Sequence, residues 1–215
     1  MTQLYSLQFV SFLVLALIVY FMVGRTRLRS CQWVVLLVAS LGFYLFSGWQ
    51  NLFFIGVTAL SVWLVGLRFD ALDRLEGKLK RDAADRAEKR EVKRRVKQRK
   101  WVFLLLVMVL NFGILSYVKY WNVILGMLGA ADGPLASHLL LPLGISFYTF
   151  QSIGYVIDCY FGKCPPERNF ARFLLFVSYF PQLIQGPINR FDDLATQLYE
   201  PHRFDVHNAR RALLL

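Results

Sequence analysis

Long runs of apolar residues without a charge dominate the first half of the chain. They cover residues 7–23, 31–48, 52–67 and 101–118. Each run is close to the ~17–25 residues that a helix needs to cross the hydrocarbon of a bilayer, where backbone N–H and C=O groups must bond within the helix. One such run is compatible with a soluble core helix, but four of them are not. The pattern therefore predicts an all-α, polytopic transmembrane helix bundle.

Composition and charge refine this prediction. Hydrophobic residues make up 56% of the 215 residues, which is more than the roughly 45–50% of soluble domains. Residues 68–100 hold 14 of the 25 Lys and Arg residues and 7 of the 14 acids, and Arg25, Arg27 and Arg29 form a second basic cluster. Because basic residues in short loops mark the cytoplasmic side, both clusters predict an extracytoplasmic N-terminus. No basic segment precedes the first run, so we expect a retained helix and not a signal peptide.

The most basic part of the chain is residues 81–100, RDAADRAEKREVKRRVKQRK. Its helix-forming residues and its opposite charges spaced three or four apart predict a helix. We expect residues 68–100 to form a basic cytosolic helical loop that anionic lipid headgroups attract. Interleaved acids and the lack of aromatic residues in this helix argue against nucleic acid as a partner.

The second half of the chain has apolar segments of a different kind. Residues 119–138 contain the turn sequence AADGP and predict an extracytoplasmic connection. Residues 139–161 are apolar but interrupted by Pro142, Gly144, Ser146, Thr149, Gln151, Ser152, Gly154 and Asp158. Residues 170–184 are short for a crossing and run into PQLIQGPINR, whose prolines and glycine must break a helix. Since broken backbone at membrane depth must be covered by protein or line a wet cavity, this half predicts a cavity wall.

Two sequence blocks resemble the signature region of the membrane-bound O-acyltransferase family. They are LPLGISFYTFQSIGYVIDCYFGK and FLLFVSYFPQLIQGPINR, and the closest resemblance is to bacterial members that O-acetylate alginate and other exported polysaccharides. FYLFSGWQNLFFIGVTALSVWLVGL and LNFGILSYVKYWN occupy the places of the family's second to fourth helices, so the resemblance extends over residues 40–198, with residues 139–200 as the signature region.

The resemblance implies a function and its partners. A many-helix bundle would surround a passage in which an acetyl or other short acyl group meets a polysaccharide acceptor on the far side. The donor would be a cytosolic thioester such as acetyl-CoA, with no bound cofactor. An extracytoplasmic acyltransferase partner and a multi-pass location in the bacterial inner membrane are implied as well.

The resemblance also implies roles for single residues, each beside a plainer structural interpretation. Candidates for the substrate path are Ser146, Gln151, Tyr155, Asp158, Gln182 and Arg190, and residues of the structural motif are Pro142, Gly144, Pro181, Gly186 and Pro187. Ser146 would alternatively bond a backbone carbonyl one turn back. Gln151 and Asp158 share one helix face. Arg190 would either extend to the membrane interface or pair with Asp158 or a donor phosphate.

The family's general base is an intramembrane histidine in the C-terminal half. His138, His202 and His207 do not match its position, and the last two lie in a polar stretch typical of solvated surface. The resemblance thus implies a catalytic histidine beyond Leu215. We expect residues 201–215 to begin a truncated further segment and the chain to be catalytically incomplete.

The three cysteines do not predict a metal site. Cys31, Cys159 and Cys164 lack metal-type spacing, so we expect them to pack as apolar side chains, with a Cys159–Cys164 disulfide as the alternative. A transporter and a non-catalytic membrane scaffold stay open as alternative functions. A transporter would favour an inverted repeat, which is not evident in the sequence.

Overall fold

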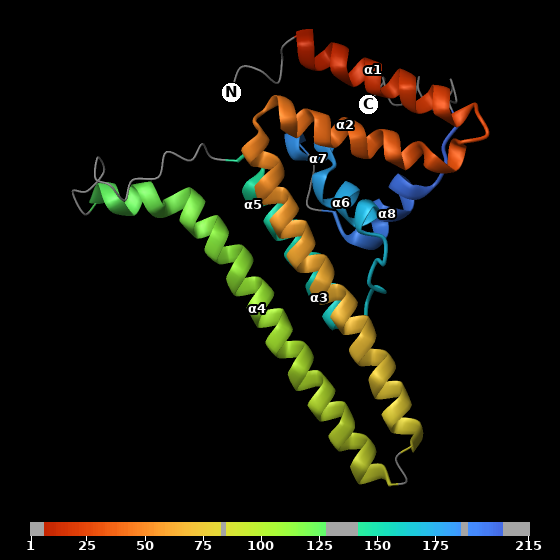
Figure 1. Ribbon diagram of the computed structural model, residues 1–215, viewed down its shortest axis with the longest axis vertical. Coiled ribbons are helices and arrows are strands. Elements are labelled where there is room, and N and C mark those ends of the chain that lie inside the picture. Colours follow the sequence, from red (N-terminus) through yellow and green to blue (C-terminus); the bar gives the residue numbers. More distant parts are fainter. Residues whose placement is uncertain (1–6, 83–84, 128–141, 186–188, 204–215) are drawn as a thin grey trace.

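The described parts of the chain are mostly helical (Figure 1). The computed structural model describes residues 7–82, 85–127, 142–185 and 189–203, and these contain no strand. The elements are α1 (Leu7–Gly24), the 3-10 helix η1 (Arg29–Cys31), α2 (Gln32–Phe46), α3 (Trp49–Asp82), α4 (Arg86–Met127), α5 (Ile145–Tyr160), α6 (Phe170–Ser178), α7 (Phe180–Gln185) and α8 (Phe191–Tyr199). The predicted all-α class is confirmed.

The apolar helices lie where the four charge-free runs predicted them. Among the described residues, three helical segments are long and apolar enough to cross a membrane: Arg29–Phe46, Trp49–Asp82 and Arg86–Trp121. Phe9–Gly24 is a shorter apolar helix. The chain is therefore a multi-pass helical membrane protein, as predicted. The side of the membrane on which each loop lies stays a prediction.

Helices α3 and α4 form a long hairpin that projects from the other helices (Figure 1). At ~1.5 Å per residue, their 34 and 42 residues span about 50 and 63 Å, more than the ~30 Å of hydrocarbon. The separate helix predicted over residues 81–100 is wrong in its bounds, because α3 continues to Asp82 and α4 begins at Arg86. The charged residues have a high helix propensity, the apolar runs must be helical to satisfy their backbone in lipid, and no proline occurs before residue 134 to separate the two.

The far end of α4 extends into the predicted connection over residues 119–138. The helix continues through Met127, and the rest of the connection, including AADGP, lies outside the described residues.

A buried charge ties α3 to α4. The Lys100 side chain is 90% covered, and its Nζ pairs with Asp73 Oδ1 at 2.5 Å. The same ammonium group lies 5.5 Å from the centroid of the Phe69 ring, which is fully buried. Because an ammonium group loses its hydration when buried, Asp73 and Phe69 must replace it. The pair therefore fixes the register of the hairpin just beyond the apolar runs.

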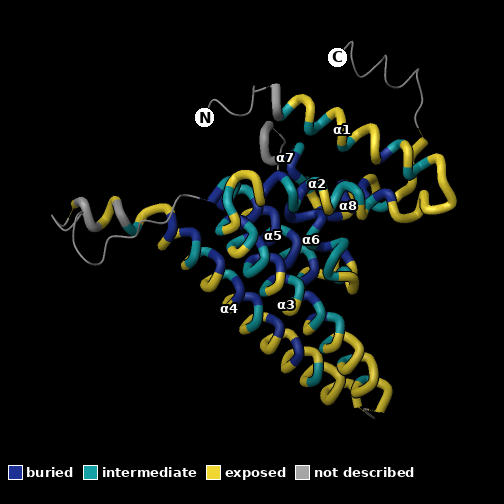
Figure 2. The backbone as a smooth tube through the Cα atoms, turned by 45° about the horizontal axis from the view of Figure 1, so that its top comes forward, coloured by how far each residue is buried: buried dark blue, intermediate teal, exposed yellow. Residues whose placement is uncertain are grey.

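The core lies where α3, α5 and α6 meet (Figure 2). Helix α5 packs against both α3 and α4, and α6 packs against α2 and α3. Helices α1 and α2 lie side by side across one end of this group (Figure 1). The fully buried side chains include Tyr44, Ile55, Val62, Tyr148, Phe173 and Phe176. This packing brings the signature region into contact with helices from the start of the chain.

Hydrogen bonds of Gln32 with Tyr20 and His202, which we call the Gln32 node, join the α1–α2 turn to the segment after α8. Gln32 is 1% exposed, and its Nε2 donates to the carbonyl oxygens of Tyr20 at 3.1 Å and His202 at 3.0 Å. Its Oε1 accepts the N–H of His202 at 2.9 Å. The predicted surface position of His202 agrees with its exposed side chain, but its backbone is held by these bonds. A Cβ at Gly24 would overlap the Gln32 amide.

We expect Gly24→Ala to weaken this node. Displacing the Gln32 amide removes hydrogen bonds to buried groups, so the free energy of unfolding should fall by ~1–2 kcal/mol. Thermal unfolding of the purified protein in detergent measures the loss. The matched control is Gly42→Ala in α2, where a new Cβ meets no atom within 4 Å and the helix gains up to ~1 kcal/mol of propensity. Equal shifts of the unfolding temperature in both variants would show that the hydrogen bonds of Gln32 do not contribute to stability.

Candidate functional site

The helical conformation is interrupted between α6 and α7. Tyr179 has φ −57° and ψ 101°, which ends α6 at Ser178, and α7 begins at Phe180. Pro181 explains the break, because in a continuous helix its ring would clash with the carbonyl group of Val177 and offer it no N–H. The sequence predicted a helix break in this region, and the structure places one just ahead of the first proline. Gly186 and Pro187 lie outside the described residues.

Two side chains replace the backbone hydrogen bond that the break removes. In a continuous helix the N–H of Phe180 would bond the carbonyl oxygen of Phe176. Instead, Gln151 Nε2 donates to the Phe176 carbonyl oxygen at 3.3 Å, and the Phe180 N–H donates to Ser40 Oγ at 3.4 Å. Helix breaks within a bilayer persist only where neighbours satisfy the freed groups in this way. Helices α2 and α5 thus support the break from two sides.

Two of the predicted path candidates meet at the break. Gln151 Nε2 also donates to Gln182 Oε1 at 3.3 Å, and the two side chains are only 2% and 6% exposed. Ser146 lies in the first turn of the same helix as Gln151 and is half-buried. At the start of that helix, Gly144 has φ +70°, a conformation that favours glycine, and Pro142 is buried.

Buried hydroxyl groups accompany these amides. Within the described part of the chain, four have no hydrogen-bond partner: those of Tyr44, Tyr148, Ser152 and Ser178. All four side chains are fully buried. A buried hydroxyl without a partner costs about 1–3 kcal/mol, which makes the cluster unusual for a purely structural core.

We call these residues the buried polar seam. It comprises Ser40, Tyr44, Tyr148, Gln151, Ser152, Ser178 and Gln182, on α2, α5, α6 and α7; α6 packs against α2 and α5, and hydrogen bonds link α7 to both of them. The sequence analysis missed Ser40, Tyr44, Tyr148, Ser152 and Ser178 as site residues, although it named Ser152 among the polar interruptions of residues 139–161. A tyrosine or serine in an apolar helix gives no sign of whether its hydroxyl will find a partner.

Tyr155 holds the connection between α5 and α6. Its hydroxyl accepts the N–H of Glu167 at 2.8 Å, and its ring lies 4.7 Å from the ring centroids of both Phe173 and Phe191. A Cβ added at Gly66 would come within 3.4 Å of the same hydroxyl, so α3 approaches closely here. These contacts are structural, and a role of Tyr155 in the substrate path stays a prediction.

Asp158 and Arg190 do not form the ion pair that the sequence left open. Asp158 pairs with Lys163 at 3.4 Å, and Arg190 is exposed at the start of α8. The charges of Asp158 and Arg190 both affect the pKa of Asp192. Burial raises this pKa, as do the charges of Asp158 and Asp193, and the charge of Arg190 lowers it.

The cysteines carry free thiols. The sulfur atoms of Cys159 and Cys164 are 3.4 Å apart and both side chains are buried, so the structure shows packing and not the alternative disulfide. The predicted packing is wrong for Cys31, which is exposed in the 3-10 helix η1. In the part of the chain that the structure describes, no group of three His, Cys, Asp or Glu side chains is arranged to hold a metal ion.

We expect Gln151→Leu to destabilise the protein by roughly 1–2 kcal/mol. The leucine fills similar space but leaves the Phe176 carbonyl without its side-chain donor. Unfolding in detergent, followed by circular dichroism, measures the change. Gln197→Leu on the exposed face of α8 is the matched control and should cost less than about 0.5 kcal/mol. A loss no larger than that of the control would show that the Gln151 bonds contribute nothing.

We expect Asp192→Asn to raise the unfolding temperature at neutral pH. A carboxyl group with a raised pKa in the folded state adds stability below its unfolded pKa and loses it as pH rises through the folded pKa. The amide side chain of the variant does not ionise, so the variant avoids this loss of stability. Its gain in unfolding temperature should therefore disappear as pH falls toward about 4. Unfolding temperatures between pH 4 and 8 measure the effect. A benefit that does not change with pH would rule out the charge effect.

The fold and the site together define a class: a multi-pass helical membrane protein with a proline-broken helix packed against buried amides and hydroxyls. Comparison with known proteins specifies it further. The chain is 37% identical over 196 residues to the probable alginate O-acetylase AlgI of Pseudomonas syringae pv. tomato, which covers 86% of this chain and 32% of that protein. It is 36% identical over 206 residues to the probable alginate O-acetylase AlgI of Pseudomonas aeruginosa, covering 90% and 34%.

A relative that is named for a different acceptor also matches. The peptidoglycan O-acetyltransferase of Helicobacter pylori is 31% identical over 124 residues, or 46% of this chain and 24% of that protein. No protein-family profile matches the chain. No solved structure matches it either. The chain belongs to the membrane-bound O-acyltransferase family, as its signature blocks predicted, and spans about a third of the length of the alginate O-acetylases it matches.

Proposed function

We propose that the chain is part of an O-acyltransferase that moves an acetyl or other short acyl group from a cytosolic thioester, acetyl-CoA, toward an exported polysaccharide. The similarity to alginate O-acetylases over 86% of the chain carries this proposal. Alginate and peptidoglycan both present sugar hydroxyl groups, so the relatives' names agree on the acceptor chemistry. In the reaction a thioester C–S bond breaks and an ester C–O bond forms.

The buried polar seam gives this function a physical basis. An acyl carbonyl or a sugar hydroxyl that enters the apolar interior needs hydrogen-bonding groups in place of water. The hydroxyls of Tyr148, Ser152 and Ser178 are free to supply them, since they have no partner among the described residues. Gln151 and Gln182 hold the broken helix beside them. The seam would therefore form part of the substrate path.

The general base of the proposed reaction lies elsewhere. It must take the proton of the acceptor hydroxyl as the ester forms. His202 is bonded at the Gln32 end of α2, and Ser40 of the seam lies about 12 Å further along that helix. We therefore place the base outside the described residues.

The proposal includes an orientation and a partner. The hairpin end and the Arg25–Arg29 turn would face the cytosol, with the N-terminus outside. The protein would lie in the bacterial inner membrane, and an extracytoplasmic acyltransferase would complete transfer to the polymer. The basic charges of residues 68–100 and of the α1–α2 turn support this orientation.

The test is polymer acetylation in a polysaccharide-producing strain that lacks its own O-acetylase. The gene for the whole O-acyltransferase of which this chain is proposed to be part, called the parent gene, should restore O-acetyl groups, measured on the purified polymer by proton NMR. Tyr148→Phe removes a hydroxyl without a partner, so the fold should be unharmed, but acetylation should fall about fivefold, the value of one hydrogen bond of ~1 kcal/mol.

Two controls separate the outcomes. Tyr117→Phe alters an exposed tyrosine of α4 and should leave acetylation unchanged, and immunoblots of the membrane fraction compare protein levels. No acetylation by the parent gene would remove the proposed function. Acetylation that survives Tyr148→Phe at the full level would keep the function but exclude this hydroxyl from the substrate path.

A further inference from the structure

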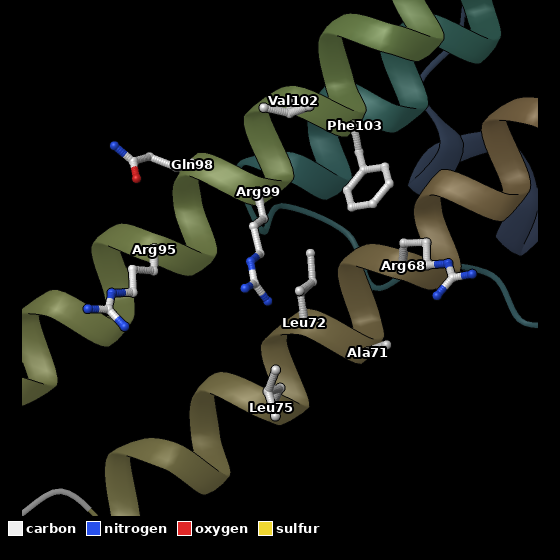
Figure 3. Close-up of a pocket in the computed structure, with 9 residues that line it drawn as sticks. All are labelled: Arg68, Ala71, Leu72, Leu75, Arg95, Gln98, Arg99, Val102 and Phe103. Atoms are coloured by element: carbon white, nitrogen blue, oxygen red, sulfur yellow. The ribbon is translucent and has the colours of Figure 1, made fainter.

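A groove with basic and apolar side chains opens between α3 and α4 (Figure 3). Its volume is about 680 Å³. Leu72 of α3 and Phe103 of α4 point into the space between the two helices, and Arg99 reaches across it toward Leu72 (Figure 3). Arg68 and Arg95 complete the basic lining. The groove is thus amphipathic and does not involve the buried polar seam.

Two of these arginines are not neutralised. Arg95 pairs with Glu91 on its own helix. Among the described residues, no carboxylate oxygen lies within 4.0 Å of Arg68 or Arg99. Both residues are exposed, in contrast to the paired and buried Lys100 next to Arg99. The groove therefore has unpaired positive charge on both of its walls.

The groove lies at the level where the charge-free runs end. Arg68 follows directly on the run over residues 52–67, and Arg99 lies just before the run over residues 101–118. Trp101 is 52% exposed, as expected of an aromatic residue at a membrane interface. Lipid headgroups occupy this level of the bilayer, and their phosphates accept paired hydrogen bonds from arginine.

One face of α4 continues the groove into the apolar region. Arg95, Arg99, Val102, Leu106 and Val109 follow at intervals of three or four residues, so they share one side of the helix. The three apolar members are 51%, 61% and 70% exposed. Guanidinium groups followed by an open apolar stripe match the order of headgroup and acyl chain in a phospholipid.

We propose that this groove binds an anionic phospholipid, with its phosphate held by Arg99 and by Arg68, whose exposed side chain turns from its position in Figure 3 toward the groove, and with an acyl chain along Val102 and Leu106. Basic pockets between membrane helices are known to hold such headgroups. A second copy of the chain does not fit, because it would bring arginines against arginines. The bound lipid sets the depth of the hairpin in the membrane. This proposal does not depend on the proposed acyltransferase function.

The test is lipid binding to the purified full chain in detergent, counted by native mass spectrometry. Dioleoyl phosphatidylglycerol and dioleoyl phosphatidylcholine are the two probes. The variant R68Q/R99Q should lower the affinity for phosphatidylglycerol by about thirtyfold, since it removes the charge-assisted hydrogen bonds of two guanidinium groups to the phosphate. The control K93Q/K97Q removes the same charge from exposed residues on other faces of α4 and should change the affinity less than about twofold.

A second double variant controls for an effect of misfolding. R68K/R99K keeps the charge but loses the paired guanidinium bonds, so about threefold weaker binding is expected. Circular dichroism should show unchanged helix content in all variants. Equal losses in R68Q/R99Q and K93Q/K97Q would indicate general charge attraction and overturn the proposal. Equal binding of both lipids would also overturn it, as would displacement of the lipid by micromolar acetyl-CoA, which would assign the groove to a soluble phosphorylated ligand.

Discussion

The hydrogen bond that is missing between Phe180 and Phe176 organises the signature region. Pro181 makes a continuous helix impossible, and in an apolar environment neither freed backbone group can be left to water. Ser40 and Gln151 must therefore lie where they do, from helices far apart in the sequence. A shift of one residue along α5 would turn the Gln151 amide by about 100° and leave the carbonyl group unpaired. The break thus sets the register of α2 and α5 against α6.

Two further polar contacts stabilise the arrangement away from the break. Lys100 and Asp73 align α3 with α4, and Gln32 ties the α1–α2 turn to His202. Both use a nearly buried polar side chain whose partners come from distant segments. In a membrane protein, packing among apolar helices has little hydrophobic driving force, so directional polar contacts select one arrangement among many. The same reasoning explains why these residues lie at the ends of the apolar segments.

The fold was more predictable than the site, for identifiable reasons. The apolar runs predicted α1 to α4, because crossing hydrocarbon demands uninterrupted helix. The bounds of α3 and α4 were missed because charge marks where a run leaves the lipid and not where its helix ends. In the site, Gln151 was visible as an amide in an apolar segment. The Tyr44 and Tyr148 hydroxyls were not, because their lack of a partner depends on packing between distant helices.

The surface is largely apolar, unlike that of a soluble protein, and the apolar core also encloses polar side chains. Val109 is 70% exposed and Phe46 is 86% exposed, yet Gln151, Ser152 and Ser178 are almost completely buried. In water, both features would lower stability. In lipid the apolar surface carries no such cost, and the remaining cost falls on the hydroxyls that have no partner in the described residues. They lie on the helices that meet at the break, where the backbone is already irregular. Because the unpaired hydroxyls and the irregular backbone occur together, we regard the buried polar seam as a place where a polar group of the substrate can bind.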